Sequence, residues 1–106
     1  EKGFYAIGVD TNQDGVSPGD VLTSMLKHVE VAVYESCKAS YEGTFEGGIS
    51  VYDLKAGGVG YSDMKYTRDK VPDELLTKVD ELAEMIKNGY FVVPTTTEEA
   101  YEFALP

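Results

Sequence analysis

The chain opens with an unbroken apolar run, residues 4–9, which carries no charge before Asp10. A short run of this kind, followed at once by the polar turn residues 11–15, is typical of a strand covered on both faces in a parallel α/β sheet. Residues 21–26 predict a second strand, because Val and Thr favour strands and Gly19 would weaken a helix here. Ligands bind just outside the carboxyl ends of such strands, so Asp10 is the first candidate for a ligand contact.

Two segments have the three- and four-residue spacing of amphipathic helices. Residues 27–41 place apolar and small side chains on one face, and Gly43 follows as the expected end of the helix. Residues 72–88 form the clearest pattern, with Pro72 at the start and acids in the first turn. Its apolar stripe consists of Leu75, Leu76, Val79, Leu82, Ala83 and Ile86.

The remaining segments have weaker patterns. Residues 49–54 alternate apolar and polar positions, which predicts a strand. Residues 55–61 are rich in glycine and are predicted to be irregular, and the polar residues 62–70 to be a surface loop. Residues 91–93 predict a short strand.

The charge of the chain narrows the ligand classes. It carries 19 acidic and 9 basic residues, a formal net charge of -10. Nucleic acid is excluded as a partner, because phosphate neutralisation needs clustered Lys and Arg. A neutral or cationic ligand suits this field better than a phosphorylated one. The chain begins without Met and enters a strand within three residues, so we interpret it as a piece of a longer protein.

Two motifs suggest chemistry, but a structural role explains each better. Residues 10–15 match the first half of a calcium-binding EF-hand loop, yet the twelfth position, which needs Glu, is Val21. We therefore expect a polar turn and no metal. Residues 57–60 lack the Gly-Lys-Ser/Thr ending of a phosphate loop, and a dinucleotide fingerprint would need glycine at Asp63. A turn, or close approach of a ligand to the backbone, explains these glycines better.

Single reactive residues indicate no catalytic site. Cys37 is predicted to be a buried, inert thiol on a helix face. His28 has no partner at a catalytic spacing, so packing at a helix N-terminus or exposure is expected. Lys55 either lies on the solvated surface or donates hydrogen bonds to ligand oxygens. We expect no enzymatic activity and no cofactor.

Three segments together resemble the C-terminal portion of the basic membrane protein (Bmp/PnrA-like) family. They are YAIGVDTNQ at residues 5–13, VLTSMLKHVEVAVYE at residues 21–35 and GGISVYDLKAGGVGY at residues 47–61. The helix at residues 72–88 and the following GYFVVP resemble the ending of the family. Its members are substrate-binding lipoproteins of ABC transporters, with a type I periplasmic-binding-protein fold and nucleoside ligands.

For the fold, the resemblance implies a fragment of a two-lobe α/β protein with three α/β/α layers and a mostly parallel sheet. Residues 1–47 would supply elements of the second lobe. Residues 48–106 would supply a crossover strand and a C-terminal helix that returns to the first lobe. Apolar faces would then lack their usual cover, so self-association of the fragment is expected.

For function, the resemblance implies an ABC-importer component that binds a nucleoside, is anchored by lipid outside the cytoplasm, and delivers its ligand to a permease. Asp10 would accept hydrogen bonds from ribose hydroxyls, which suits a carboxylate with two oxygens. Lys55 would face the same cleft, and Gly57 would allow close approach. The acidic cleft would repel phosphate. The alternative is a ligand-sensing regulatory or interaction module on the same fold.

Overall fold

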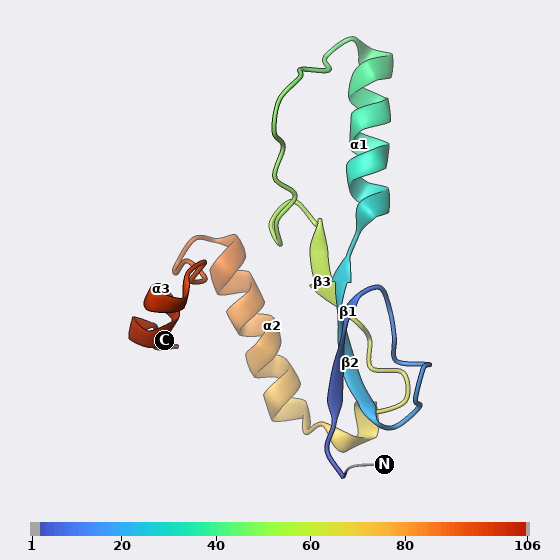
Figure 1. The fold of residues 1–106 in the computed structure, drawn as a ribbon, viewed down its shortest axis with the longest axis vertical. Helices are drawn as coiled ribbons and strands as arrows, with labels where there is room; N and C mark the ends of the chain where they lie inside the picture. Colours follow the sequence, from blue (N-terminus) through green and yellow to red (C-terminus); the bar gives the residue numbers. More distant parts are fainter. Residues whose placement is uncertain (1–2, 106) are drawn as a thin grey trace.

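The computed structural model describes residues 3–105, which form a small mixed sheet and several helices (Figure 1). The strands are β1 (Ala6–Asp10), β2 (Val21–Lys27) and β3 (Val59–Tyr61). The helices are α1 (Val29–Glu42), the 3-10 helix η1 (Arg68–Lys70), α2 (Asp73–Lys87) and α3 (Thr97–Glu102). The chain therefore has the α/β class expected of a fragment of a periplasmic-binding fold.

The sheet has the order β1-β2-β3, with β1 parallel and β3 antiparallel to the central β2. Asp10 pairs with Leu26 across the first ladder, and Lys27 pairs with Val59 across the second. The carboxyl ends of β1 and β2 and the amino end of β3 thus lie along one edge of the sheet. We call this edge, marked by Asp10, Lys27 and Val59, the carboxyl edge.

The first two strands and the two long helices are confirmed. Helix α1 ends at Gly43, whose φ of 71° is left-handed and whose N–H group donates to the Ser40 carbonyl. Thr44 adds a hydrogen bond from its N–H to the Ala39 carbonyl, which completes the usual glycine-terminated helix end. Helix α2 starts directly after Pro72, with two acids in its first turn.

The strand predicted for residues 49–54 is wrong, and the irregular stretch predicted for residues 55–61 is wrong for 59–61, whereas residues 55–58 are irregular as predicted. Residues 49–54 form no strand, and Ile49 is 99% exposed. A strand needs a neighbour for its backbone groups, and the described part of the chain provides none there. Strand β3 instead comes from the glycine-rich stretch, because it pairs with β2. Residues 91–93 are also irregular.

Two predictions of burial are corrected as well. The segment predicted as a surface loop contains η1 and contributes the buried side chains of Ser62, Met64 and Thr67. Cys37, predicted to be buried, is exposed. Helix α1 has no buried residue, because nothing in residues 3–105 covers its apolar face.

The most deeply buried side chains are polar. Asp14, Ser24, Ser62 and Thr67 are each at most 2% exposed, and we call these four residues the polar core. Ser24 Oγ donates to Asp14 Oδ1 at 2.6 Å, and the Ser24 backbone N–H donates to Ser62 Oγ at 3.1 Å. These bonds tie the loop after β1 and the loop after β3 to the central strand.

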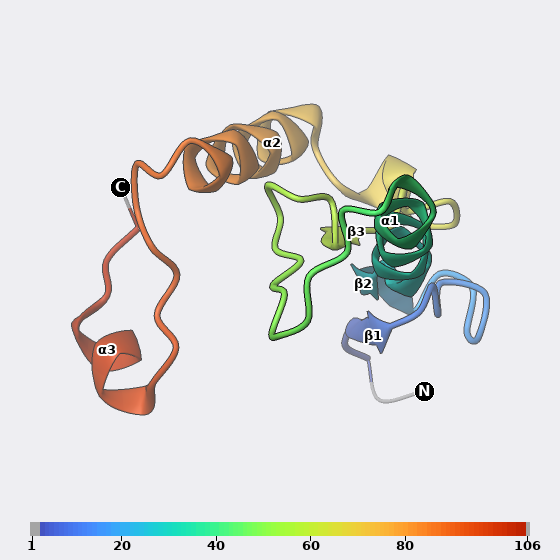
Figure 2. The same cartoon turned by 90° about the horizontal axis from the view of Figure 1, so that it is seen from above.

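The helices extend away from the sheet (Figures 1 and 2). The radius of gyration is 16.8 Å, whereas a compact domain of this size has about 13 Å. Close backbone contacts between the described elements are confined to the strand pairs β1–β2 and β2–β3. The sheet therefore carries the candidate site with little support from the helices.

Candidate functional site

Asp10 ends β1 in an unusual backbone conformation. Its φ is +74°, in the left-handed region that Asp and Asn tolerate better than most residues. The carbonyl oxygen of Val9 accepts hydrogen bonds from the Thr11 N–H at 3.0 Å and from Gln13 Nε2 at 2.8 Å. This clamp fixes the backbone on both sides of Asp10. The carboxylate, whose side chain is 64% exposed, is thereby held beyond the end of the strand.

Asp10 lines a hollow of about 400 Å³ at the carboxyl edge. Residues 10–12 and 26–30 line this hollow, so it lies between two strand ends and the N-terminus of α1. Lys27 Nζ is 3.2 Å from Asp10 Oδ1. The volume falls within the range of small-molecule sites. The hollow thus combines a carboxylate, an ammonium and the positive end of a helix.

His28 lies directly before α1, which agrees with the prediction that it is placed at the N-terminus of a helix. Its Nδ1 is 2.8 Å from Glu30 Oε1. The pKa of the Glu30 carboxyl is lowered, mainly by the backbone N–H of Glu30 itself and then by the His28 side chain. This pair lines the same hollow as Asp10.

Lys55 lies on a tight turn built by Asp53. The Gly58 N–H donates to the Asp53 carbonyl at 2.9 Å, and the Ala56 N–H donates to Asp53 Oδ1 at 2.9 Å. The His28 N–H donates to the Gly58 carbonyl at 2.9 Å, which fixes the turn to the end of β2. The turn therefore holds Lys55 near the carboxyl edge.

The two glycines of this turn have different roles. Gly57 has a left-handed φ of +73° and open space where a side chain would be, so approach of a ligand here stays a prediction. Gly58 packs under the preceding segment, and a Cβ at this position would overlap the carbonyl oxygen of Tyr52. The close approach that the structure requires is at Gly58, within the chain itself.

Asp10, Lys55 and Gly57 do not share one cavity among residues 3–105. Lys55 lines a hollow of about 260 Å³ with the end of α2, and Gly57 lines another of about 390 Å³. His28 borders both the hollow of Asp10 and that of Gly57. The three residues thus lie around one end of the sheet, and their meeting in a common cleft stays a prediction.

Lys27 and Gln13 are the residues of this edge that the sequence pattern did not single out. Both acquire their role from the pairing of β1 with β2, which is not visible in either strand alone. The signal available in the sequence was that Lys27 follows one apolar run and Asp10 follows the other, so parallel pairing of the two strands would place them side by side. The calcium-like loop forms a hydrogen-bonded turn, in which the Asp14 N–H donates to Asn12 Oδ1 at 3.0 Å.

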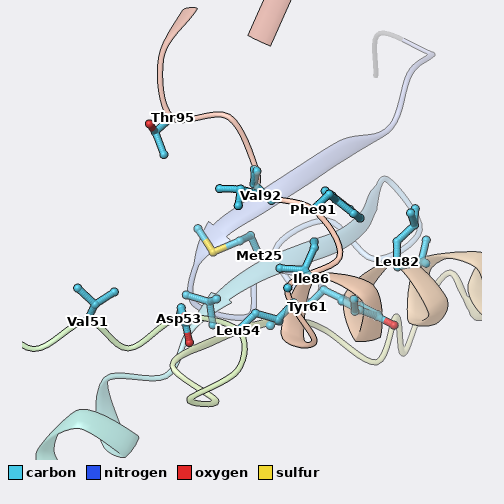
Figure 3. A pocket seen from close by; sticks show the side chains of 16 residues that line it. Met25, Val51, Asp53, Leu54, Tyr61, Leu82, Ile86, Phe91, Val92 and Thr95 are labelled. Atoms are coloured by element: carbon cyan, nitrogen blue, oxygen red, sulfur yellow. The ribbon is translucent and has the colours of Figure 1, made fainter. Parts of the chain in front are cut away.

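A further hollow, of about 850 Å³, is an apolar groove (Figure 3). It lies between α2, the ends of β2 and β3, and the segment after α2. Its lining includes Val79, Leu82, Ala83 and Ile86, which belong to the apolar stripe of α2. Because this stripe is the face a helix normally buries, we interpret the groove as a core surface that residues 3–105 leave uncovered.

Known proteins of one family are similar in sequence to this chain. The family described as PnrA-like ABC transporter substrate-binding proteins matches residues 1–97. An uncharacterized lipoprotein of Pyrococcus horikoshii is 33% identical over 92% of this chain, and a basic membrane protein of Borrelia garinii is 36% identical over 95%. The alignments cover 31% and 29% of those relatives, so the chain spans about a third of their length.

Two crystal structures share the fold. A solute-binding protein of an ABC transporter system from Aeropyrum pernix has a TM-score of 0.68 and 27% identity, over 92% of this chain and 35% of that protein. A transcriptional activator of the comK gene from Bacillus halodurans has a TM-score of 0.73 and 24% identity, over 85% of this chain and 31% of that protein. The second likeness concerns the fold alone. No helix within residues 3–105 has the length and apolar content needed to cross a bilayer.

Proposed function

The chain belongs to the PnrA-like family of ABC transporter substrate-binding proteins, and from this premise we propose that the full-length protein captures a nucleoside between two lobes. The protein then delivers its ligand to a permease and catalyses no reaction. The observation that carries the proposal is the Asp10 carboxylate, held beyond a strand end by a residue that lines a hollow of about 400 Å³. A carboxylate in this place accepts charge-assisted hydrogen bonds from two hydroxyls of a sugar.

The other parts of the proposal concern the cleft. Lys55 donates hydrogen bonds to ligand oxygens, and Gly57 lets the ligand approach the backbone. Residues 1–47 belong to the second lobe, and residues 48–106 return to the first lobe. Lobe closure over the carboxyl edge brings these groups together. The net charge of -10 favours a nucleoside over a nucleotide.

The location proposed for the full-length protein is the outer side of the membrane, with a lipid anchor. The supporting observation is the description of a relative, that of P. horikoshii, as a lipoprotein. The alternative of a ligand-sensing regulatory module has no observation of its own, because the likeness to the comK activator is one of fold alone.

A thermal-shift screen of a full-length protein carrying this chain tests the proposal. Nucleosides, sugars and amino acids are compared on the wild type and on Asp10→Asn. A ligand at 100 times its Kd stabilises by about 2.7 kcal/mol, which gives a clear shift in Tm. We expect nucleosides alone to shift the wild type, and Asp10→Asn to respond weakly.

The matched control is Asp63→Asn, which removes one carboxylate from an exposed loop position. It should respond to nucleosides as the wild type does. A wild type that is stabilised by sugars or amino acids but by no nucleoside would refute the proposed ligand class.

A further inference from the structure

Lys27 is the final residue of β2, and its ammonium lies beside the end of β1. Nζ is 3.2 Å from Asp10 Oδ1, and the two side chains are 57% and 64% exposed. An ion pair this exposed contributes little to folding. The effect of Lys27 should therefore be sought in what it does to the Asp10 carboxylate rather than in stability.

The backbone around Asp10 is already fixed, so rotation of its carboxylate is the remaining freedom. Val9 O accepts hydrogen bonds from both Thr11 and Gln13, on the far side of Asp10 in sequence. Lys27 Nζ lies beside Oδ1 of this carboxylate. An ammonium at one oxygen restricts rotation of the carboxylate, while both oxygens keep lone pairs for a ligand.

Charge balance supports the same role. When lobes close over a carboxylate, water leaves and an uncompensated charge becomes costly. His28 and Glu30 line the same hollow, but Glu30 is engaged with His28 at 2.8 Å. Within residues 3–105, Lys27 is the cation that forms an ion pair with Asp10.

We propose that Lys27 is a positioning residue, whose ammonium orients the Asp10 carboxylate so that its two oxygens meet the two adjacent hydroxyls of a ribose. This inference rests on the proposed function. It makes Lys27 a determinant of the choice between ribose and 2′-deoxyribose, because a deoxyribose offers only one hydroxyl to the oriented pair of oxygens.

The test measures Kd by calorimetry on a full-length protein carrying this chain. The ligands are adenosine and guanosine, each with its 2′-deoxy counterpart. Freezing one flexible side chain changes affinity by about two- to tenfold. In Lys27→Met we expect ribonucleoside binding to weaken by a factor in this range, and deoxynucleoside binding by less than about twofold. Lys27→Arg, which keeps a cation beside Asp10, should retain the wild-type ratio.

Lys78→Met is the control, because it removes one ammonium from an exposed position of α2. It should change neither Kd. If Lys27→Met weakens both sugars equally, or neither, Lys27 has no orienting role, while wild-type nucleoside binding still upholds the proposed function. If the wild type binds none of the four nucleosides and no pyrimidine nucleoside either, the proposed function fails and this inference fails with it.

Discussion

The polar core and the apolar groove are built in opposite ways. The four residues of the polar core are at most 2% exposed and are tied to neighbouring loops and strands by hydrogen bonds. The apolar groove has a volume of about 850 Å³, and lining side chains such as Val51 and Val92 (labelled in Figure 3) stay largely exposed. Among the described residues, the polar core is thus hydrogen-bonded except at Asp14 Oδ2, which is buried without a partner, whereas the apolar groove is left uncovered by residues 3–105.

This difference shows which physical effect organises the loop after β1 at the carboxyl edge. Hydrogen bonds are directional, so Ser24 and its partners fix the loop after β1 without a large apolar area. Hydrophobic burial is roughly proportional to the apolar area removed from water, and the groove removes little. Hydrogen bonds therefore shape the loop after β1, whereas Val59, at the same carboxyl edge, also lines the groove.

The largest effect is expected from breaking the polar core. Ser24→Ala removes the hydroxyl that donates to Asp14 Oδ1 and accepts from the Gln13 N–H at 3.0 Å. Each buried group left without a partner costs about 1–3 kcal/mol. Urea unfolding of a full-length protein should show this loss. Thr77→Ala, at an exposed hydroxyl of α2, is the control and should cost far less. Equal losses in the two variants would show that the polar core does not hold the fold.

A charged side chain placed in the apolar groove tests whether copies of the chain associate through this surface. We expect the isolated 106-residue chain to self-associate through this surface. Leu82→Lys should weaken the association by about tenfold or more, because burying a leucine contributes about 1.5–3 kcal/mol. Sedimentation velocity at several concentrations measures the effect, with Thr77→Lys on an exposed position of the same helix as the control. A wild-type chain that sediments as a clean monomer at high concentration would contradict the expectation.

The smallest effect concerns the hydrogen bond between β3 and α2. The Tyr61 hydroxyl donates to Asp80 Oδ1, and this bond, followed by burial and the charge of Asp80, raises the pKa of Tyr61 above 10.0. A raised pKa means that the stabilisation is complete below pH 10 and is lost as the pH rises through the folded-state value. Tyr61→Phe should therefore be less stable than the wild type at pH 8, and the gap should narrow above pH 10. The melting temperatures at both pH values measure this, with exposed Tyr41→Phe as the control. A gap that does not change with pH would exclude the role of Asp80.

The regular elements that could be predicted from sequence are those whose pattern is local. Helix α2 follows from its apolar stripe and Pro72, and strand β1 from its apolar run. Residues 49–54 have an alternating pattern yet remain irregular, because a strand also needs a partner. Strand β3 lies in a glycine-rich stretch and owes its form to pairing with β2.

In the candidate site too, features with a local sequence pattern could be predicted, and features that depend on contacts between segments could not. Asp10 could be proposed because it directly follows an apolar run and ends a strand. The ion pair of Lys27 with Asp10 depends on parallel pairing, which no single segment reveals. The burial of Ser24 and Ser62 was also not foreseen, since serine is usually exposed and only the three-dimensional contacts show its partners.

The left-handed backbone of Asp10 limits how this protein can change in evolution or in the laboratory. At a φ of +74°, Asp, Asn and Gly are the residues that fit with little strain. Asn keeps the shape and removes the charge, whereas a larger or β-branched residue would disturb the strand end before it changed the chemistry. Substitutions should therefore be tolerated more easily at the exposed Lys27 and Lys55 than at Asp10, which makes Asp10 the most constrained of these three positions.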